Sequence, residues 1–234
     1  MYLNFIKNAI VFLVLYIPPL ILFMKYWNER GRGKVLLLVI SIIYLILSLF
    51  TQNLLPFILV LICIKYIRDS GREDYYSYGF TIKNFKILRA FKYSLISYLG
   101  TIIIAIIALS VFSLFNFPIK DQEIITQITE LPLKRYIMTI PIIVIFAPII
   151  EEFTFRWLFL QKIFKNRLGM VISSIITSLI FSLVHFNLKS FPAIFWIGLF
   201  NCYLINKHGY WYAVFNHAFF NSVSTFAILI QKLY

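Results

Sequence analysis

The chain has 234 residues, of which 61% are hydrophobic and 13% are charged, and its mean hydropathy is +0.87. A soluble domain needs far more polar surface, so this composition excludes a soluble globular protein and predicts an integral membrane protein. The formal net charge of +13 does not indicate a nucleic-acid partner. The basic residues lie in short segments between apolar runs, and no recognition motif accompanies them.

Eight apolar segments follow one another along the chain and predict membrane-spanning helices. They cover residues 8–24, 35–50, 54–67, 92–116, 134–161, 168–187, 190–206 and 210–231. A helix needs about 20 residues to cross a bilayer, so the second and third segments are short. The alternative is one long helix over 35–67, kinked at Pro56, which would give seven spans.

The positions of the basic residues favour eight spans. With a turn at Thr51-Gln52-Asn53 and both termini outside, the cytoplasmic loops hold 15 of the 22 Lys and Arg residues. Seven spans would place the basic loops 25–34 and 65–92 on opposite sides, against the positive-inside rule. The sequence therefore predicts an all-α, polytopic helical bundle of about eight transmembrane helices, a multi-pass protein of the cell membrane embedded in the lipid bilayer.

No repeat, low-complexity tract or soluble domain interrupts the chain, so 1–234 is expected to form a single integral membrane domain. The first apolar run contains Pro18-Pro19 and offers no cleavage site, which predicts a retained span rather than a signal peptide. Thr81–Lys92 has basic and apolar residues at helical spacing and is expected to lie along the cytoplasmic surface. Cys63 and Cys202 are interpreted as apolar packing residues.

Two of the nine acidic residues, Glu151 and Glu152, are adjacent inside a long apolar stretch. A charge at bilayer depth costs roughly 3 kcal/mol, so such a pair predicts a functional site. Arg156 follows Glu152 by four positions, and the two side chains can therefore form an ion pair on one helix face. Glu151 points about 100° away and keeps no cation from its own motif, as a general base for water requires.

Two further motifs space their residues four apart, about one helical turn. They are Phe181 and His185 in SLIFSLVHF, and His217 and Asn221 in YWYAVFNHAFFNS. If the three helices converge, these residues and Glu151 supply a base, a partner that holds water, and two donors for an oxyanion.

Each of these residues alone has a simpler interpretation. An intramembrane His or Asn is more often a packing or interhelical hydrogen-bonding residue, and a Glu-Arg pair can be a structural bridge or part of an ion pathway. The joint occurrence favours chemistry, because two of the three histidines take part. The third, His208, lies in the loop Lys207–Gly209 and is expected to be a solvated surface residue.

The motifs EExxxR, FxxxH and HxxxN, present here as EEFTFR, FSLVH and HAFFN, occur in this order and spacing. In this the chain resembles the CPBP family of intramembrane proteases, which includes the CaaX prenyl endopeptidases and the bacterial Abi proteins. The resemblance is strong over about Pro141 to Ser222, and the catalytic core is taken as about 134–231. Trp157 stands where the family usually has Gly, and its bulk is expected to reshape the substrate cavity.

The resemblance implies a cavity open towards the cytoplasm and a catalytic set of Glu151, His185, His217 and Asn221. Glu151 would activate water with His185, and the other two would stabilise the tetrahedral oxyanion. No cofactor is expected. Zinc held by Glu151, His185 and His217 is the alternative, but Asn221 favours the metal-free mechanism, because an amide is a poor zinc ligand and a good oxyanion donor.

The resemblance also implies supporting roles for Glu152 and Arg156. The expected function is an intramembrane endopeptidase that hydrolyses a peptide or protein near the cytoplasmic membrane face, in peptide processing or bacteriocin self-immunity. The alternative is a non-catalytic membrane scaffold or peptide-binding protein that retains the site. A transporter with the Glu pair as a proton relay would have inverted repeats, which the sequence does not show.

One difficulty concerns depth in the membrane. The predicted spans place Glu151 towards the cytoplasmic end of the fifth span and His185 near the outer end of the sixth. Convergence therefore requires tilted or extended helices, and Pro141 and Pro148 are expected to bend the helix ahead of Glu151.

Overall fold

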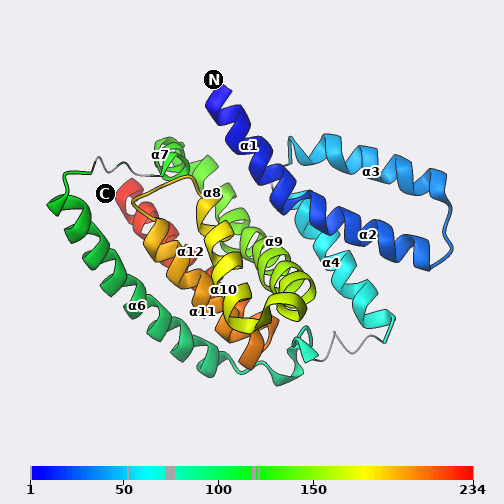
Figure 1. The fold of residues 1–234 in the computed structure, drawn as a ribbon. Coiled ribbons are helices and arrows are strands. Elements are labelled where there is room, and N and C mark those ends of the chain that lie inside the picture. Colours follow the sequence, from blue (N-terminus) through cyan, green and yellow to red (C-terminus); the bar gives the residue numbers. More distant parts are fainter. Residues whose placement is uncertain (1, 52, 72–76, 118–119, 121, 234) are drawn as a thin grey trace.

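The computed structural model describes residues 2–51, 53–71, 77–117, 120 and 122–233. Within these ranges the secondary structure is helical, without a strand, which confirms the all-α prediction (Figure 1). Gln52 of the predicted turn and parts of the predicted loops 65–92 and 116–133 lie outside the described residues.

The helices in chain order are α1 (Tyr2–Leu15), α2 (Ile17–Glu29), α3 (Lys34–Ser48), α4 (Leu54–Asp69), the 3₁₀ turn η1 (Ile82–Asn84), α6 (Ile87–Leu114), α7 (Glu123–Glu130), α8 (Leu133–Pro141), the π-helix η2 (Ile142–Phe146), α9 (Ala147–Glu151), the π-helix η3 (Glu152–Phe164), α10 (Lys165–Leu183), α11 (Phe191–Lys207) and α12 (Tyr210–Leu233). Segments α8 to η3 form one continuous helix, and the chain then turns at Gly169, where φ is +74°, so that α10 packs back along η3 (Figure 1).

Each of the eight predicted apolar segments coincides largely with a helix, but eight membrane crossings are not confirmed. By length and composition, four helical segments of the described chain are long and apolar enough to cross a membrane, and these are Phe5–Glu29, Ile87–Leu114, Leu133–Leu183 and Tyr210–Leu233. Helices α3, α4 and α11 have 15, 16 and 17 residues, fewer than the roughly 20 that a bilayer needs. The break between α3 and α4 rules out the single long helix over 35–67.

The helices form two groups that meet at α9. Helices α1 to α4 make one group, in which α2 and α4 pack together and α4 contacts α9 (Figure 1). The other group is built from the α8–η3 helix, α10, α11 and α12, with α6 packed along α11 and α12. The short helix α7 lies at the end of the molecule that also carries both termini (Figure 1). The acidic pair therefore sits where the two groups join.

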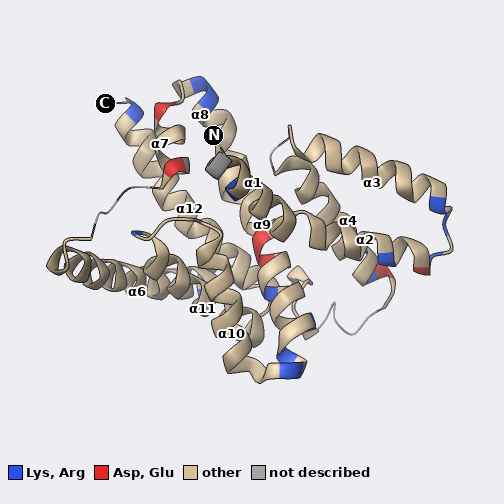
Figure 2. Ribbon diagram, turned by 45° about the horizontal axis from the view of Figure 1, so that its top comes forward, with Lys and Arg blue, Asp and Glu red and all other residues tan. Residues whose placement is uncertain are grey.

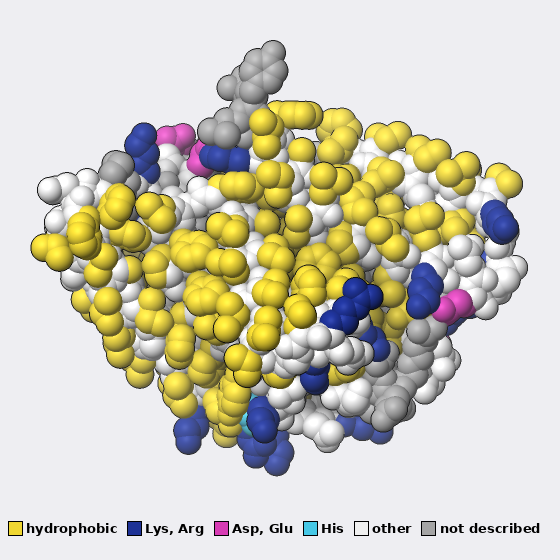
Figure 3. Space-filling view, in the orientation of Figure 1, with side chains coloured by type: hydrophobic (Ala, Val, Ile, Leu, Met, Phe, Trp, Pro, Cys, Tyr) yellow, Lys and Arg dark blue, Asp and Glu magenta, His cyan; other side chains and the backbone are white. Residues whose placement is uncertain are grey.

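The surface agrees with a membrane environment. Large apolar side chains are exposed along the helices, for example Ile103 at 58% and Val171 at 73%, and hydrophobic side chains cover the middle of the face in Figure 3. Lys and Arg gather at the connections on the end opposite α7 (Figures 2 and 3). Cys63 and Cys202 are buried free thiols, so their interpretation as packing residues is confirmed.

The segment Thr81–Lys92, which is predicted to lie along the cytoplasmic surface, is not one continuous helix. Only Ile82–Asn84 forms a 3₁₀ turn before α6 begins at Ile87. Residues 78–86 are instead tied to the start of α12 by three hydrogen bonds, from Tyr210 N to the Tyr78 carbonyl (2.8 Å), from Trp211 Nε1 to the Phe80 carbonyl (2.8 Å), and from Lys86 N to the Tyr212 hydroxyl (3.1 Å).

The turn before α12 also corrects the expectation for His208. Its ring is half-buried among three tyrosines, with ring centroids 4.6 Å from Tyr93, 5.2 Å from Tyr212 and 6.0 Å from Tyr203. His208 is therefore a packing residue of this junction rather than a solvated one.

The junction depends on two glycines whose backbones touch. Gly79 has φ +65°, and a Cβ placed on it would lie 2.7 Å from the Gly209 Cα. Gly79→Ala should lower the apparent melting temperature in detergent by about 5 °C or more, because it combines left-handed backbone strain with a clash against backbone atoms. Gly33→Ala is the matched control, since a Cβ there would meet nothing within 4 Å. Equal melting temperatures for the two variants would show that the close approach does not stabilise the fold.

Candidate active site

The helix that carries the acidic pair has an altered hydrogen-bonding register. In η2 the N–H of Ala147 bonds to the carbonyl of Ile142, five residues back. The next carbonyl, that of Ile143, would be the partner of Pro148 in this register, but proline has no N–H. A free carbonyl inside an apolar bundle must find another donor.

Asn221 supplies that donor from α12. Its Nδ2 lies 2.8 Å from the Ile143 carbonyl oxygen. A side-chain amide has two N–H groups, so one can close the gap in the neighbouring helix while the other stays available. This residue of the HxxxN motif therefore has a structural contact that sequence analysis did not foresee.

Glu152 is the centre of the buried polar group. Its Oε1 accepts hydrogen bonds from His217 Nδ1 (2.8 Å) and from Asn201 Nδ2 (2.9 Å). Its Oε2 lies 3.4 Å from Nε of Arg156, and both side chains are fully buried. The guanidinium of Arg156 also stands 4.3 Å above the centre of the Phe181 ring. The predicted Glu152–Arg156 ion pair is therefore present, and Glu152 additionally binds the histidine of the third motif.

This contact fixes the orientation of His217. A carboxylate can only accept hydrogen bonds, so Nδ1 of His217 carries the proton and Nε2 points the other way. On that side, Nε2 lies 3.7 Å from Oε2 of Glu151, whose side chain is 16% exposed. The two adjacent carboxylates are thus in different surroundings. Glu152 is fully buried, with two hydrogen bonds and an ion pair, whereas Glu151 faces a histidine from a partly open site.

His185 is connected to His217 through ring contacts with Phe181. Its Nδ1 lies 2.7 Å from the Phe181 carbonyl oxygen, and its ring contacts the Phe181 ring at a centroid distance of 4.9 Å. The Phe181 ring in turn lies 5.7 Å from the ring of His217. No hydrogen bond between the described residues joins His185 to Glu151. The spacing of the FxxxH motif therefore places a phenyl ring between the two histidines.

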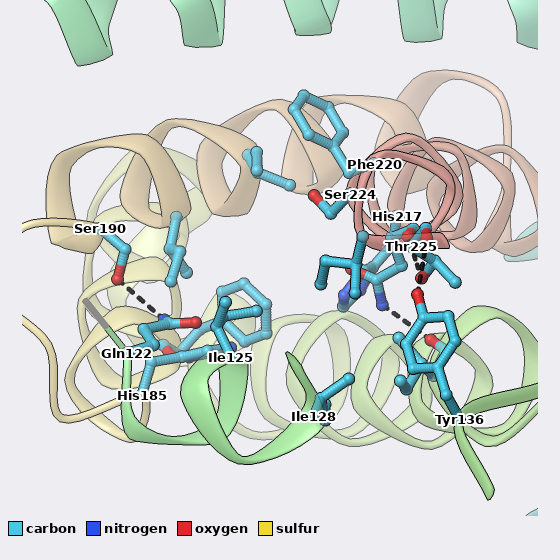
Figure 4. Close-up of a pocket in the computed structure, with 16 residues that line it drawn as sticks. Gln122, Ile125, Ile128, Tyr136, His185, Ser190, His217, Phe220, Ser224 and Thr225 are labelled. Atoms are coloured by element: carbon cyan, nitrogen blue, oxygen red, sulfur yellow. Dashed lines mark hydrogen bonds between the residues drawn. The ribbon is translucent and has the colours of Figure 1, made fainter. Parts of the chain in front are cut away.

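Three of the four predicted catalytic residues share one cavity of about 210 Å³. Its polar wall contains His185, His217 and Asn221, and Figure 4 shows both histidines beside it. The remaining lining residues are Gln122, Ile125, Ile128, Tyr136, Ile143, Phe181, Ser190, Ile194, Ile197, Phe220, Ser224, Thr225 and Ile228. Glu151 is not part of this wall, so it contacts the site through His217.

Helix α7 covers the cavity, with Ile125 and Ile128 turned inward (Figure 4). Gln122 Nε2 donates to the Ser190 hydroxyl at 2.8 Å, and Lys232 Nζ donates to the Thr129 carbonyl at 2.6 Å. Helix α7 lies at the end of the molecule opposite most of the basic connections (Figure 2), so the cavity that it lines lies towards that end. The positive-inside rule places that end away from the cytoplasm, in disagreement with the cytoplasmic opening that the family resemblance implies.

Trp157 does not shape the cavity, which corrects the sequence expectation. Its side chain is fully buried and packs against Phe80 and Phe153, at centroid distances of 5.5 and 4.8 Å. The bulk that replaces the usual glycine therefore fills the core on another face of η3.

Sequence analysis missed Asn201 and Asn216, both fully buried. Asn216 Nδ2 donates to the side-chain oxygen Oδ1 of Asn201 at 2.7 Å, and Asn201 Nδ2 donates to Glu152. The available signal was weak, namely a single amide within an otherwise apolar helix and another directly before His217.

A metal site is not evident in the geometry. Among the residues that the structure describes, no three His, Cys, Asp or Glu side chains are arranged to hold a metal ion. The zinc alternative would need Glu151, His185 and His217 to converge on one point. His217 turns its free Nε2 towards Glu151, but the Phe181 ring lies between His185 and His217. Whether the reaction uses a metal remains a prediction.

Comparison with known proteins supports the motif analysis. Residues 133–223 match the family model described as type II CAAX prenyl endopeptidase Rce1-like. The match begins at α8, ends within α12, and contains all three motifs, so the resemblance to the CaaX protease family is confirmed for this part of the chain. No curated protein and no solved structure matches the chain.

The orientation of the cavity is open to a direct test. The charge distribution predicts that the C-terminus, next to α7, faces away from the cytoplasm. A C-terminal alkaline phosphatase fusion should therefore be active, and a fusion after Gly31, in the basic turn, should be inactive, because this reporter folds only outside the cytoplasm. The reverse pattern would contradict the charge argument and restore the cytoplasmic opening that the resemblance implies.

Proposed function

We propose that this chain is an intramembrane endopeptidase that hydrolyses a peptide or protein by a water activated at Glu151. The observation that carries the proposal is the pairing of Glu151 with an oriented His217, 3.7 Å apart, beside a cavity walled by His185 and Asn221. The family match over 133–223 supports the reaction class.

The proposed chemistry begins with a water between Glu151 and the substrate carbonyl. Glu151 takes a proton from the water, and the hydroxide oxygen bonds to the carbonyl carbon, which gives a tetrahedral oxyanion. The C–N bond then breaks, and the proton passes from Glu151 to the leaving amine. His185 would help to hold the water, and general-base assistance of this kind contributes about 10²–10⁴ in rate.

His217 and Asn221 are proposed as the oxyanion donors. Because Nδ1 of His217 is bound to Glu152, its free Nε2 can donate only in the imidazolium form. The Glu152 carboxylate favours that form, as the aspartate of a catalytic triad does. Asn221 would use the amide N–H that does not bind Ile143. One such donor contributes about 10²–10³ in rate.

The cavity supports a substrate with an apolar side chain near the cut. Six of its 16 lining residues are isoleucine and two are phenylalanine. Its volume of about 210 Å³ is smaller than the roughly 300–1,000 Å³ of ligand sites. It therefore suits a side chain or short segment of a peptide rather than a large ligand. Peptide processing or bacteriocin self-immunity is the proposed role. A cut near the cytoplasmic face requires an orientation opposite to the one that the charges favour.

A non-catalytic scaffold is the second candidate, and one observation favours it. Asn221, Glu152 and Arg156 all have structural contacts, so a protein could retain them without catalysis. Glu151 separates the two functions, because within the described residues its ion-pair contact is to His217, at 3.7 Å, and it holds no other part of the site in place. A scaffold would tolerate its loss.

The test uses purified protein in liposomes with a pool of internally quenched peptides that carry an apolar anchor. Glu151→Gln, His185→Ala and His217→Ala should abolish cleavage without loss of membrane insertion. Asn221→Ala should lower the rate about 10²–10³-fold. Glu130→Gln, an exposed carboxylate outside the site, is the control. Unchanged cleavage by Glu151→Gln would refute the assignment, and loss of cleavage with a chelator would favour zinc.

A further inference from the structure

A chain of buried amides connects the site to the far side of the bundle. Asn201 on α11 donates from Nδ2 to Glu152 Oε1 at 2.9 Å. Asn216 on α12 donates from Nδ2 to Asn201 Oδ1 at 2.7 Å and to the Ser97 hydroxyl of α6 at 3.3 Å. Every member is fully buried.

The direction of these hydrogen bonds is fixed from the Glu152 end, because a carboxylate can only accept, whereas the Ser97 hydroxyl can both donate and accept. A terminal amide can place either its oxygen or its nitrogen towards a neighbour. The amide of Asn201 must therefore turn its Nδ2 towards Glu152, and its Oδ1 accepts from Asn216 Nδ2. The reverse orientation would set an amide oxygen against a carboxylate, and both groups can only accept.

The far end of the chain is held rigidly. Ser97 also accepts a hydrogen bond at its carbonyl from Trp196 Nε1, at 3.1 Å. Gly100, one turn further along α6, makes room for this indole, since a Cβ there would lie 2.7 Å from Trp196 Cζ2. The position of Asn216 is therefore set by contacts among α6, α11 and α12.

We propose that Asn201 and Asn216 are positioning residues that hold the Glu152 carboxylate in the rotamer that orients His217. This inference rests on the proposed function. Glu152 Oε1 lies 2.8 Å from His217 Nδ1, so a rotation of the carboxylate would move the histidine. Nε2 of His217 would then no longer face Glu151. The two asparagines act on the reaction through Glu152 and His217, without touching the substrate.

Simple packing does not explain this arrangement. The Oδ1 atom of Asn216 is buried and has no hydrogen-bond partner within the described chain, and such a group opposes folding. An apolar side chain of similar size would pack there without this penalty. The two asparagines therefore reduce the stability of the fold through the unpaired Asn216 Oδ1, and they fix the orientation of the Glu152 carboxylate.

The test combines kinetics with a readout on His217 itself. Asn201→Leu keeps the approximate size of the side chain and removes both hydrogen bonds. It should lower kcat about 10–100-fold, as for other residues that orient a catalytic ligand, with KM for the same quenched peptides changed less than about twofold. In protein labelled with ¹⁵N-histidine, the protected Nδ1–H signal of His217, assigned with His217→Gln, should exchange rapidly or disappear.

Asn206→Leu is the matched control, because it makes the same change on the same helix at an exposed position, and it should behave as wild type in both measurements. If Asn201→Leu does not fold, Asn216→Ser tests the same chain at its next member and should show the same loss. An unchanged Nδ1–H signal and kcat in either folded variant would overturn the proposal. If wild type cleaves no peptide, the proposed function fails, while the ring-proton measurement still decides whether the asparagines orient His217.

Discussion

The buried carboxylate of Glu152 is the constraint on which the rest of the site depends. A full charge in an apolar bundle persists only with partners. Here Arg156 forms an ion pair with Glu152, and His217 and Asn201 donate hydrogen bonds to its Oε1, so the partners come from three helices. These contacts of Glu152 fix the relative positions of η3, α11 and α12. The hydrogen bond from His217 Nδ1 to Glu152 also turns Nε2 of His217 towards Glu151. The buried Glu152 carboxylate therefore determines which group faces Glu151.

The backbone makes this arrangement possible. In the π-helical register the carbonyl of Ile143 would pair with residue 148, which is a proline without an N–H. Asn221 binds this carbonyl from α12 instead. The wider π-helical register on both sides of α9 changes the direction in which successive side chains point. Registers of this kind occur frequently at functional sites, where they place side chains that a regular helix would direct elsewhere. The irregular hydrogen bonding of this helix thus sets the direction in which the Glu151 side chain points.

The positions of the helices and the Glu152–Arg156 ion pair could be predicted from the sequence, because the length of an apolar segment and a spacing of four residues depend only on local geometry. It could not show that Phe181 lies between the histidines or that Trp157 faces away from the cavity, since both depend on how helices pack. Asn201 was missed for the same reason, because a lone amide gives no spacing signal. The number of membrane crossings stays a prediction, since short helices such as α3 do not settle it by length.

The central claim is that two neighbouring carboxylates have separate tasks, with Glu152 holding the structure and Glu151 available for chemistry. The most direct measurement compares the apparent melting temperatures of Glu151→Gln and Glu152→Gln in the same detergent. Glu152→Gln should melt well below wild type, because it leaves Arg156 buried without its anion, and Glu151→Gln should melt close to wild type. Equal and large destabilisation by both changes would contradict the account, since Glu151 would then belong to the structural network.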